Sequence, residues 1–193
     1  RPPVSRDHVI RNDLNERFEQ FRSLPFTLVS APAGYGKSIA VSHWLNSVNV
    51  PYGWLSLDEE HNDLKVFLNY ILTLLEEVFP GRWYGLNTLL KATTMPSSKA
   101  LLHELINSLD EIEDEFVVVL DDYHLISSYE VHEFVDYMLQ YPPENMHLVI
   151  ITRKDPPLKI KHLRAYNRMG EVRSSDLIFK EDDIRKLLFL LKV

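Results

Sequence analysis

Four short apolar runs alternate along the chain with longer stretches in which apolar residues recur at helical spacing. The runs are Phe26–Ser30, Tyr52–Leu57, Phe116–Leu120 and Leu148–Thr152. The last two are continuous in Val, Ile and Leu rather than alternating, which is typical of parallel strands covered on both faces. The pattern therefore predicts buried strands with helices between them.

The stretches between these runs predict the helices of an α/β protein. Apolar residues fall on one face in Lys37–Ser47, Leu64–Phe79 and Ala100–Leu109. Ser127 with Glu130 predicts a capping box at the start of a further helix. Strand and helix alternate, so we expect a three-layer α/β/α fold around a parallel sheet of about five strands, with right-handed crossovers.

Three later segments fit this frame less simply. Arg82–Pro96 is irregular and is interpreted as a loop or a lid. The basic stretch Lys159–Arg168 predicts a helix before a fifth short strand near Glu171–Arg173. We expect residues 1–180 to form one domain and the apolar helix Glu181–Leu191 to open a linker within 181–193 to a following domain, the alternative being a helix docked on the core.

Composition and charge narrow the possible classes. The chain has 193 residues, a formal net charge of −7 and no cysteine, which excludes disulfide frameworks, thiolate metal sites and cysteine nucleophiles. It lacks an apolar run long enough for a membrane span, and a cytoplasmic location is the default expectation. The acidic balance argues against a nucleic-acid surface over the whole domain, and we expect no direct DNA binding by the basic stretch at 159–173.

The strongest chemical signal is a glycine-rich turn between the first strand and the first predicted helix. Residues 31–38 read Ala-Pro-Ala-Gly-Tyr-Gly-Lys-Ser, a P-loop whose usual first glycine is replaced by Ala31, which fits only if its φ is negative. The glycines let successive N–H groups turn inward toward phosphates, and the helix N-terminus adds its positive end. The residues expected to bind nucleotide are Ala33, Gly34, Tyr35, Gly36, Lys37, Ser38 and Ile39. Within this set Lys37 reaches the β/γ-phosphates and Ser38 binds Mg²⁺.

The third strand ends in two adjacent carboxylates, as a Walker B segment does. Asp121 at its tip is expected to hold Mg²⁺, and Asp122 to orient or deprotonate the attacking water. The fourth strand ends in Thr152 and Arg153, on the same edge of a parallel sheet. Arg153 is expected to contact the γ-phosphate, although a surface arginine at a strand end is almost as plausible from the pattern alone.

Histidines near these positions carry a weaker signal. His124 follows the two carboxylates closely enough to line the site, but His124 and His132 have no third partner with metal-ligand spacing and are interpreted as ordinary polar positions. No Gly-x-Ser-x-Gly hydrolase motif is present.

Four segments in order give the chain a family resemblance. They are Ser30–Ser38, Trp54-Leu55-Ser56-Leu57-Asp58, Asp121-Asp122-Tyr123-His124 and Thr152-Arg153-x-Asp155-Pro156-Pro157. From about Val9 onward the chain resembles the nucleotide-binding (NB-ARC/STAND-type) ATPase domain of MalT-like signal-transduction ATPases, the large ATP-binding regulators of the LuxR class. The alanine at the start of the P-loop is the form that this group uses.

The resemblance implies a switch. Such proteins rest as an ADP-bound monomer, self-associate when ATP and an inducer are bound, and reset by slow hydrolysis. It implies further domains (a winged helix, a helical-repeat sensor and a DNA-binding helix-turn-helix) and a place for Arg11 beside the adenine. The pattern equally allows Arg11 to begin an amphipathic surface helix with Leu14, Phe18 and Phe21.

Mg-dependent ATPase activity within such a switch is the function that the sequence favours. One alternative is a small-molecule kinase, in which the basic stretch at 159–168 would serve as a lid. Another is a nucleotide-binding interaction module that never hydrolyses ATP.

Overall fold

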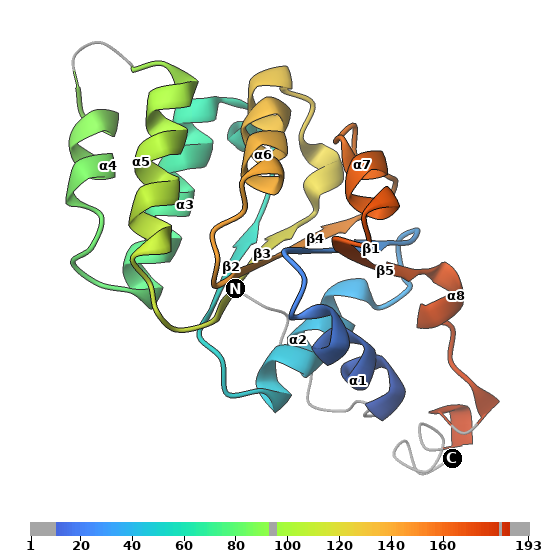
Figure 1. Ribbon diagram of the computed structural model, residues 1–193. Helices are drawn as coiled ribbons and strands as arrows, with labels where there is room; N and C mark the ends of the chain where they lie inside the picture. Colours follow the sequence, from blue (N-terminus) through green and yellow to red (C-terminus); the bar gives the residue numbers. More distant parts are fainter. Residues whose placement is uncertain (1–10, 93–95, 182, 186–193) are drawn as a thin grey trace.

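A five-stranded parallel sheet lies between two layers of helices in the computed structural model, which describes residues 11–92, 96–181 and 183–185 (Figure 1). The strands are β1 (Phe26–Ser30), β2 (Tyr52–Ser56), β3 (Phe116–Asp121), β4 (Met146–Thr152) and β5 (Met169–Arg173). The helices are α1 (Asn12–Phe21), α2 (Lys37–Ser47), α3 (Leu64–Val78), α4 (Tyr84–Leu90), α5 (Ser98–Asp110), α6 (Tyr129–Gln140), α7 (Ile160–Ala165) and α8 (Ser174–Leu177). Short 3₁₀ turns cover Glu59–Asn62 and Tyr123–Leu125. The three-layer α/β/α prediction is confirmed.

The order of the strands places the predicted site residues at one edge. The sheet runs β2-β3-β4-β1-β5, so β4 separates the P-loop strand β1 from β3. In register, Ser30 lies opposite Thr152 on one side and Arg173 on the other. Because all pairs are parallel, the carboxyl ends of the strands meet at a common edge.

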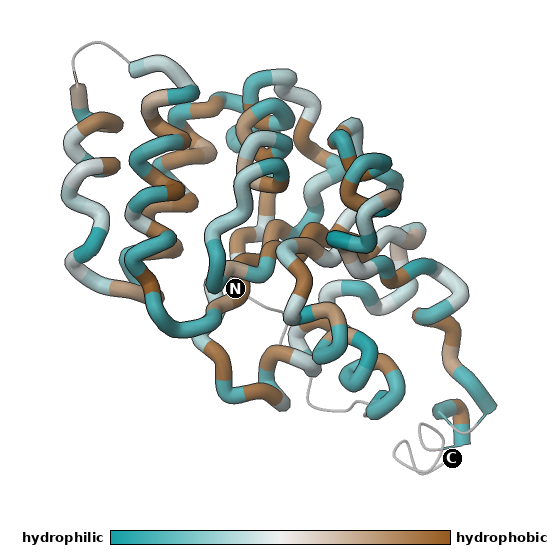
Figure 2. Tube along the Cα trace, viewed as in Figure 1, coloured by the Kyte–Doolittle hydropathy of each residue, from teal (hydrophilic) through white to brown (hydrophobic). Residues whose placement is uncertain are grey.

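The two faces of the sheet carry separate apolar cores. Alternate strand residues such as Leu28 and Leu148 pack under helices α3 to α7, and the intervening residues pack under α1 and α2. On the second face Phe18 and Trp44 stack with their ring centroids 5.3 Å apart. Figure 2 shows hydrophobic residues recurring between hydrophilic ones along the helices. Continuous apolar strands are needed because both faces are covered.

The predicted loop or lid at 82–96 is wrong for its first part. Trp83 is 2% exposed, and its indole Nε1 donates a hydrogen bond to the carbonyl oxygen of Phe79 at 2.8 Å. The helix α4 follows directly and buries Leu86 and Leu90 against α3 and α5. Residues 93–95 lie outside the described part. Residues 84–90 therefore form a helix packed against α3 and α5 rather than a loop or a lid.

The predicted capping box at Ser127 and Glu130 is wrong by one residue. Ser128 is the N-cap of α6, and its hydroxyl accepts a hydrogen bond from the backbone N–H of Val131. The backbone N–H and hydroxyl of Ser127 instead donate to Asn62 Oδ1, at 2.7 and 3.2 Å. Asn62 Oδ1 also accepts the backbone N–H of Ser128, but it engages the hydroxyl of Ser127 alone, and the hydroxyl of Ser128 is left to cap the helix.

Most of the predicted C-terminal helix lies outside the described residues. Residue 181 and residues 183–185 are helical, and the remainder of Glu181–Leu191 is not described. The division into a domain at 1–180 and a linker at 181–193 stays a prediction.

Candidate functional site

The P-loop crosses the carboxyl edge of the sheet from β1 to the N-terminus of α2. Gly34 and Gly36 have φ values of +84° and +73°, in the left-handed region that side chains disfavour, and Gly36 is the N-cap of α2. Ala31 is not among the described non-glycine residues with positive φ, which meets the condition for alanine at the start of the loop. The N–H groups of the first turn of α2 lack intrahelical partners and form, with its dipole, a site for anions.

Lys37 lies across this loop. Its ammonium Nζ donates to the carbonyl oxygen of Pro32 at 2.9 Å. Burial lowers the pKa of Lys37, and the nearby positive charge of Arg153 lowers it further, against the raising effect of Asp121 and Asp122. The lysine charge thus lies close to both groups that the sequence assigned to the γ-phosphate and the metal.

Ser38 and Asp121 meet as the two motifs predict. The Ser38 hydroxyl donates to Asp121 Oδ1 at 3.1 Å, although the residues are far apart in sequence. Asp121 is 5% exposed, and its Oδ1 also accepts the backbone N–H of Asp122 at 2.8 Å. Burial raises the pKa of Asp121, partly offset by the hydrogen bond from Ser38. Because burial disfavours the charged form of Asp121, a bound cation would stabilise its carboxylate further.

The two oxygens fit Mg²⁺ in donor type and number. Among the described residues, no group of three or more His, Asp or Glu side chains is placed to hold a metal ion. Mg²⁺ is usually bound through one or two protein oxygens, with phosphate and water oxygens completing its shell. Ser38 and Asp121 are therefore the residues that would hold it, together with a nucleotide.

Asp122 turns out of the strand into solvent. Its φ of +56° is in the left-handed region, which is uncommon for a non-glycine residue and is often found at functional sites. The ring Nδ1 of His124 lies 3.8 Å from Asp122 Oδ1. Burial, and then the charge of Arg153, lowers the pKa of His124, so the imidazole is neutral beside the carboxylate at neutral pH. His124 thus lies beside Asp122 at the carboxyl edge of the sheet, whereas the sequence alone favoured an ordinary polar position for it.

Arg153 is exposed at the end of β4, on the same edge. Its positive charge lowers the pKa of Lys37 and of His124. The charge of Arg153 therefore lies near Lys37 of the P-loop and near His124.

Arg11 lies away from this group, in a contact with the C-terminal segment. It is the residue before α1, and its guanidinium donates to the backbone oxygens of Asp176 and Leu177 at 2.8 Å. Its Nε lies 3.4 Å from Asp183 Oδ2. The amphipathic helix that the pattern allowed is confirmed, since Leu14 and Phe18 are buried. A place for Arg11 beside the adenine stays a prediction.

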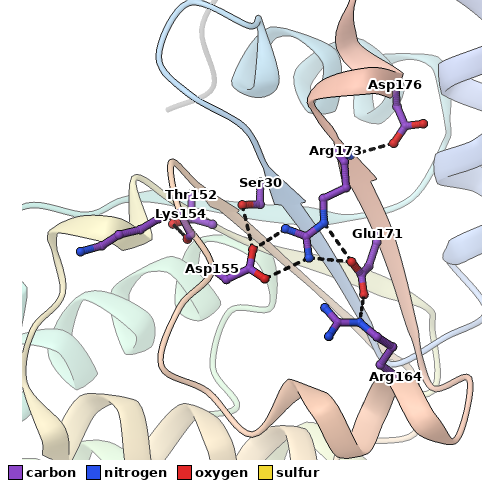
Figure 3. A network of polar contacts seen from close by, with 8 residues as sticks. All are labelled: Ser30, Thr152, Lys154, Asp155, Arg164, Glu171, Arg173 and Asp176. Carbon is purple, nitrogen blue, oxygen red and sulfur yellow. Dashed lines mark hydrogen bonds and ion pairs between the residues drawn. The ribbon is translucent and has the colours of Figure 1, made fainter.

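Sequence reasoning missed one polar cluster at the same edge, shown in Figure 3. Asp155, which follows β4, joins Ser30 of β1 to Arg173 of β5. In the sequence, Asp155 stands out only within the Thr-Arg-x-Asp-Pro-Pro run, and Arg173 only as a basic residue of the predicted fifth strand. The pairing of β5 beside β1 brings them together, and no local pattern reports that pairing.

Comparison with solved structures identifies the fold. The chain is similar to a Walker-type ATPase of Pyrococcus abyssi, with 16% identity, a TM-score of 0.56, and coverage of 96% of this chain and 60% of that one. It is similar to the ORC1 protein of Aeropyrum pernix, solved in complex with DNA, with 15% identity, a TM-score of 0.60, and coverage of 98% and 50%. Cdc6p of Pyrobaculum aerophilum gives 14% identity, a TM-score of 0.59, and coverage of 98% and 51%. The chain therefore has the fold of P-loop ATPases of the ORC and Cdc6 type.

Two further findings of the comparisons concern the family and the length of the chain. No protein-family model matches the chain. The chain spans between half and three fifths of the length of the three solved structures. Within the part of the chain that the structure describes, every helix is too short or too polar to cross a bilayer.

Proposed function

We propose that this chain binds ATP and ADP with Mg²⁺ and hydrolyses ATP slowly, as the switch module of a larger transcriptional regulator. The observation that carries the proposal is the 3.1 Å contact between Ser38 and the buried Asp121 at the N-terminus of α2. Two motifs distant in sequence supply one hydroxyl and one carboxylate at the same point, beside a glycine turn suited to phosphates. The P-loop ATPase fold supports nucleotide as the ligand.

Each residue has a role in binding. The N–H groups from Ala33 to Ile39 and the Lys37 ammonium hold the phosphates, and Ser38 and Asp121 hold Mg²⁺. A bound Mg²⁺ neutralises charge on the β- and γ-phosphate oxygens.

The hydrolytic step uses the carboxylate that points outward. The oxygen of a water molecule attacks the γ-phosphorus, the bond to the β–γ bridging oxygen breaks, and ADP leaves with the electron pair. Asp122 orients this water and accepts its proton, and Arg153 stabilises charge on the γ-phosphate oxygens. The exposed side chain of Asp122, whose strand end is fixed by the preceding Asp121, suits that task.

The regulatory part of the proposal rests on the four motif segments of the MalT-like resemblance. In it, the ADP form is a resting monomer and the ATP form self-associates. The output of the module is then the shift between monomer and assembly, not the product of ATP hydrolysis. Further domains of the whole regulator would bring the inducer sensor and the DNA-binding element, and this domain itself would contact neither DNA nor membrane.

Calorimetric titration of ADP and of ATP, each with Mg²⁺, tests the binding site. We expect both nucleotides to bind the wild-type protein and neither to bind measurably to Lys37→Ala. Lys65→Ala, which removes an exposed lysine of α3, is the matched control and should bind as wild type does. Failure of folded wild-type protein to bind either nucleotide would refute the proposal.

Phosphate release and sedimentation separate the switch from its alternatives. We expect slow release that Asp122→Asn abolishes while leaving ATP binding intact, and a larger sedimentation coefficient with ATP than with ADP. Tight binding without release, even after association, would indicate a non-hydrolysing module. Faster loss of ATP in the presence of a small-molecule acceptor would indicate a kinase.

A further inference from the structure

A cluster of charged side chains joins three elements beside the P-loop strand (Figure 3). Its centre is the Arg173 guanidinium of β5, which lies between two carboxylates. Nε and Nη2 donate to Glu171 Oε2 at 2.9 and 2.6 Å, Nη2 donates to Asp155 Oδ2 at 3.2 Å, and Nη1 donates to Asp155 Oδ1. Arg164 of α7 donates to the other oxygen of Glu171. Two carboxylates thus fix the plane of one guanidinium, the geometry in which such pairs are most specific.

The carboxylate of Asp155 also reaches the strand that carries the P-loop. Its Oδ1 accepts the hydroxyl of Ser30, the last residue of β1, at 3.1 Å. The next residue, Ala31, donates its backbone N–H to the carbonyl oxygen of Thr152 at 3.3 Å. The start of the P-loop is therefore bonded twice to this part of the chain, once through backbone to the last residue of β4 and once through Asp155 just after it.

Arg153 lies between these two attachment points. The hydroxyl of Thr152 donates to the carbonyl oxygen of Lys154 at 2.8 Å and closes a turn around Arg153. With Thr152 held by Ala31 and Asp155 held by Ser30, the backbone of Arg153 has a fixed place relative to the P-loop. Its own side chain stays exposed, free to meet a phosphate.

Stability alone explains this arrangement poorly. The side chain of Asp155 is 48% exposed and that of Arg173 is 32% exposed, and ion pairs so open to water contribute little to folding. The hydrogen bonds of Asp155 nevertheless restrict the position of the neighbouring Arg153. An error of about 1 Å in the position of a catalytic group costs rate far more than it costs stability.

We propose that Asp155 is a positioning residue: fixed by Arg173 and Ser30, it holds Arg153 over the P-loop in the place where Arg153 meets the γ-phosphate of ATP. The inference rests on the proposed function and deepens it. Asp155 touches no reacting atom itself and acts through Arg153. Its effect should therefore appear in the turnover of ATP and be absent from the binding of ADP, which has no γ-phosphate.

The test compares Asp155→Asn with wild type at a temperature well below the melting of both proteins. Asn keeps the size of the side chain and can still accept a bond from Ser30, but it loses the charge that fixes Arg173. We expect turnover to fall about tenfold, with the KM for ATP and the Kd for ADP each changed less than about twofold. Ser30→Ala, which removes the other attachment, should shift turnover in the same direction. Asp155→Glu, which restores the charge, should recover part of the loss.

A double variant and a matched control distinguish positioning from general damage. In an Arg153→Ala background, Asp155→Asn should cause no further loss, because its effect passes through Arg153. Glu115→Gln breaks an exposed pair with Arg22 at the opposite edge of the sheet and should leave turnover unchanged.

Two results would overturn this inference while leaving the proposed function intact. One is an active wild-type protein whose turnover is unchanged by Asp155→Asn. The other is a loss from Asp155→Asn that is as large in the Arg153→Ala background as in the wild type. Folded wild-type protein that binds no nucleotide or releases no phosphate would overturn the proposed function, and this inference with it.

Discussion

The buried imidazole of His147 should make the fold lose stability as pH falls below neutral. His147 lies in β4 and is 3% exposed, with its ring edge-on to Trp44 at 6.1 Å between centroids. Its Nδ1–H donates to the carbonyl oxygen of Leu24, and among the described residues its Nε2 has no hydrogen-bond partner. Burial lowers the pKa of His147 from 6.5 to about 4. The native state therefore holds the ring neutral where the unfolded chain would protonate it.

The sign and size of the effect follow from proton linkage. Below pH 6.5 the unfolded state binds a proton at this imidazole and the folded state does not. The free energy of unfolding therefore decreases as the pH is lowered, until the pH reaches the pKa of the folded state. The two pKa values give a loss of about 2 kcal/mol between pH 7.5 and pH 5, and about 3 kcal/mol in total by pH 4. Above neutral pH the contribution of this group is constant.

Urea unfolding of the wild type and of His147→Asn at several pH values measures this loss. The Asn amide can keep the bond to Leu24 but does not titrate, so the variant should lose about 2 kcal/mol less than wild type on going to pH 5. His103→Asn, at an exposed position of α5, is the control and should follow the wild type. Parallel curves for wild type and His147→Asn would refute the reasoning.

Three substitutions test packing and capping, each by urea unfolding at neutral pH. Gly53→Ala would place a Cβ 2.1 Å from Leu74 Cδ2, and we expect it to destabilise the protein by about 1–3 kcal/mol; an unchanged midpoint would mean that Leu74 moves aside freely. Ser128→Ala removes the N-cap of α6 and should cost about 1 kcal/mol, whereas a silent change would show that another group caps this helix. Tyr123→Phe leaves the buried His132 Nδ1 without its 3.0 Å bond to the phenol, an expected loss of about 1–2 kcal/mol that a stable variant would contradict.

The sequence was most informative where one local pattern carries both structure and chemistry. The strand at Phe26–Ser30 and the helix at Lys37–Ser47 have the predicted bounds, because a continuous apolar run and a glycine turn leave few other conformations. The contact between Ser38 and Asp121 followed from two such motifs at one sheet edge.

Prediction failed where distant contacts decide the outcome. The helix α4 is only seven residues long and contains Gly85, too short for a helical period to show, and the burial of Trp83 depends on its neighbours. Ser127 with Glu130 reads as the cap in sequence, but the hydroxyl of Ser127 donates to Asn62 Oδ1, a residue 65 positions away, and Ser128 caps the helix instead. Asp155 meets Arg173 because β5 pairs with β1, a neighbour relation that strand patterns do not encode.

The central position of β1 in the sheet has a consequence for the order in which the protein can fold while it is being synthesised. Phe26–Ser30 leaves the ribosome before β4 and β5, the two strands that flank it in the sheet. Until those strands emerge, both edges of an apolar strand stay open, a state in which nascent chains aggregate and recruit chaperones. The glycine turn at 31–38 has no anchored strand behind it during that time. A nucleotide added during synthesis should therefore protect the chain from protease only after residue 173 has left the exit tunnel, and shorter nascent chains should gain nothing from it.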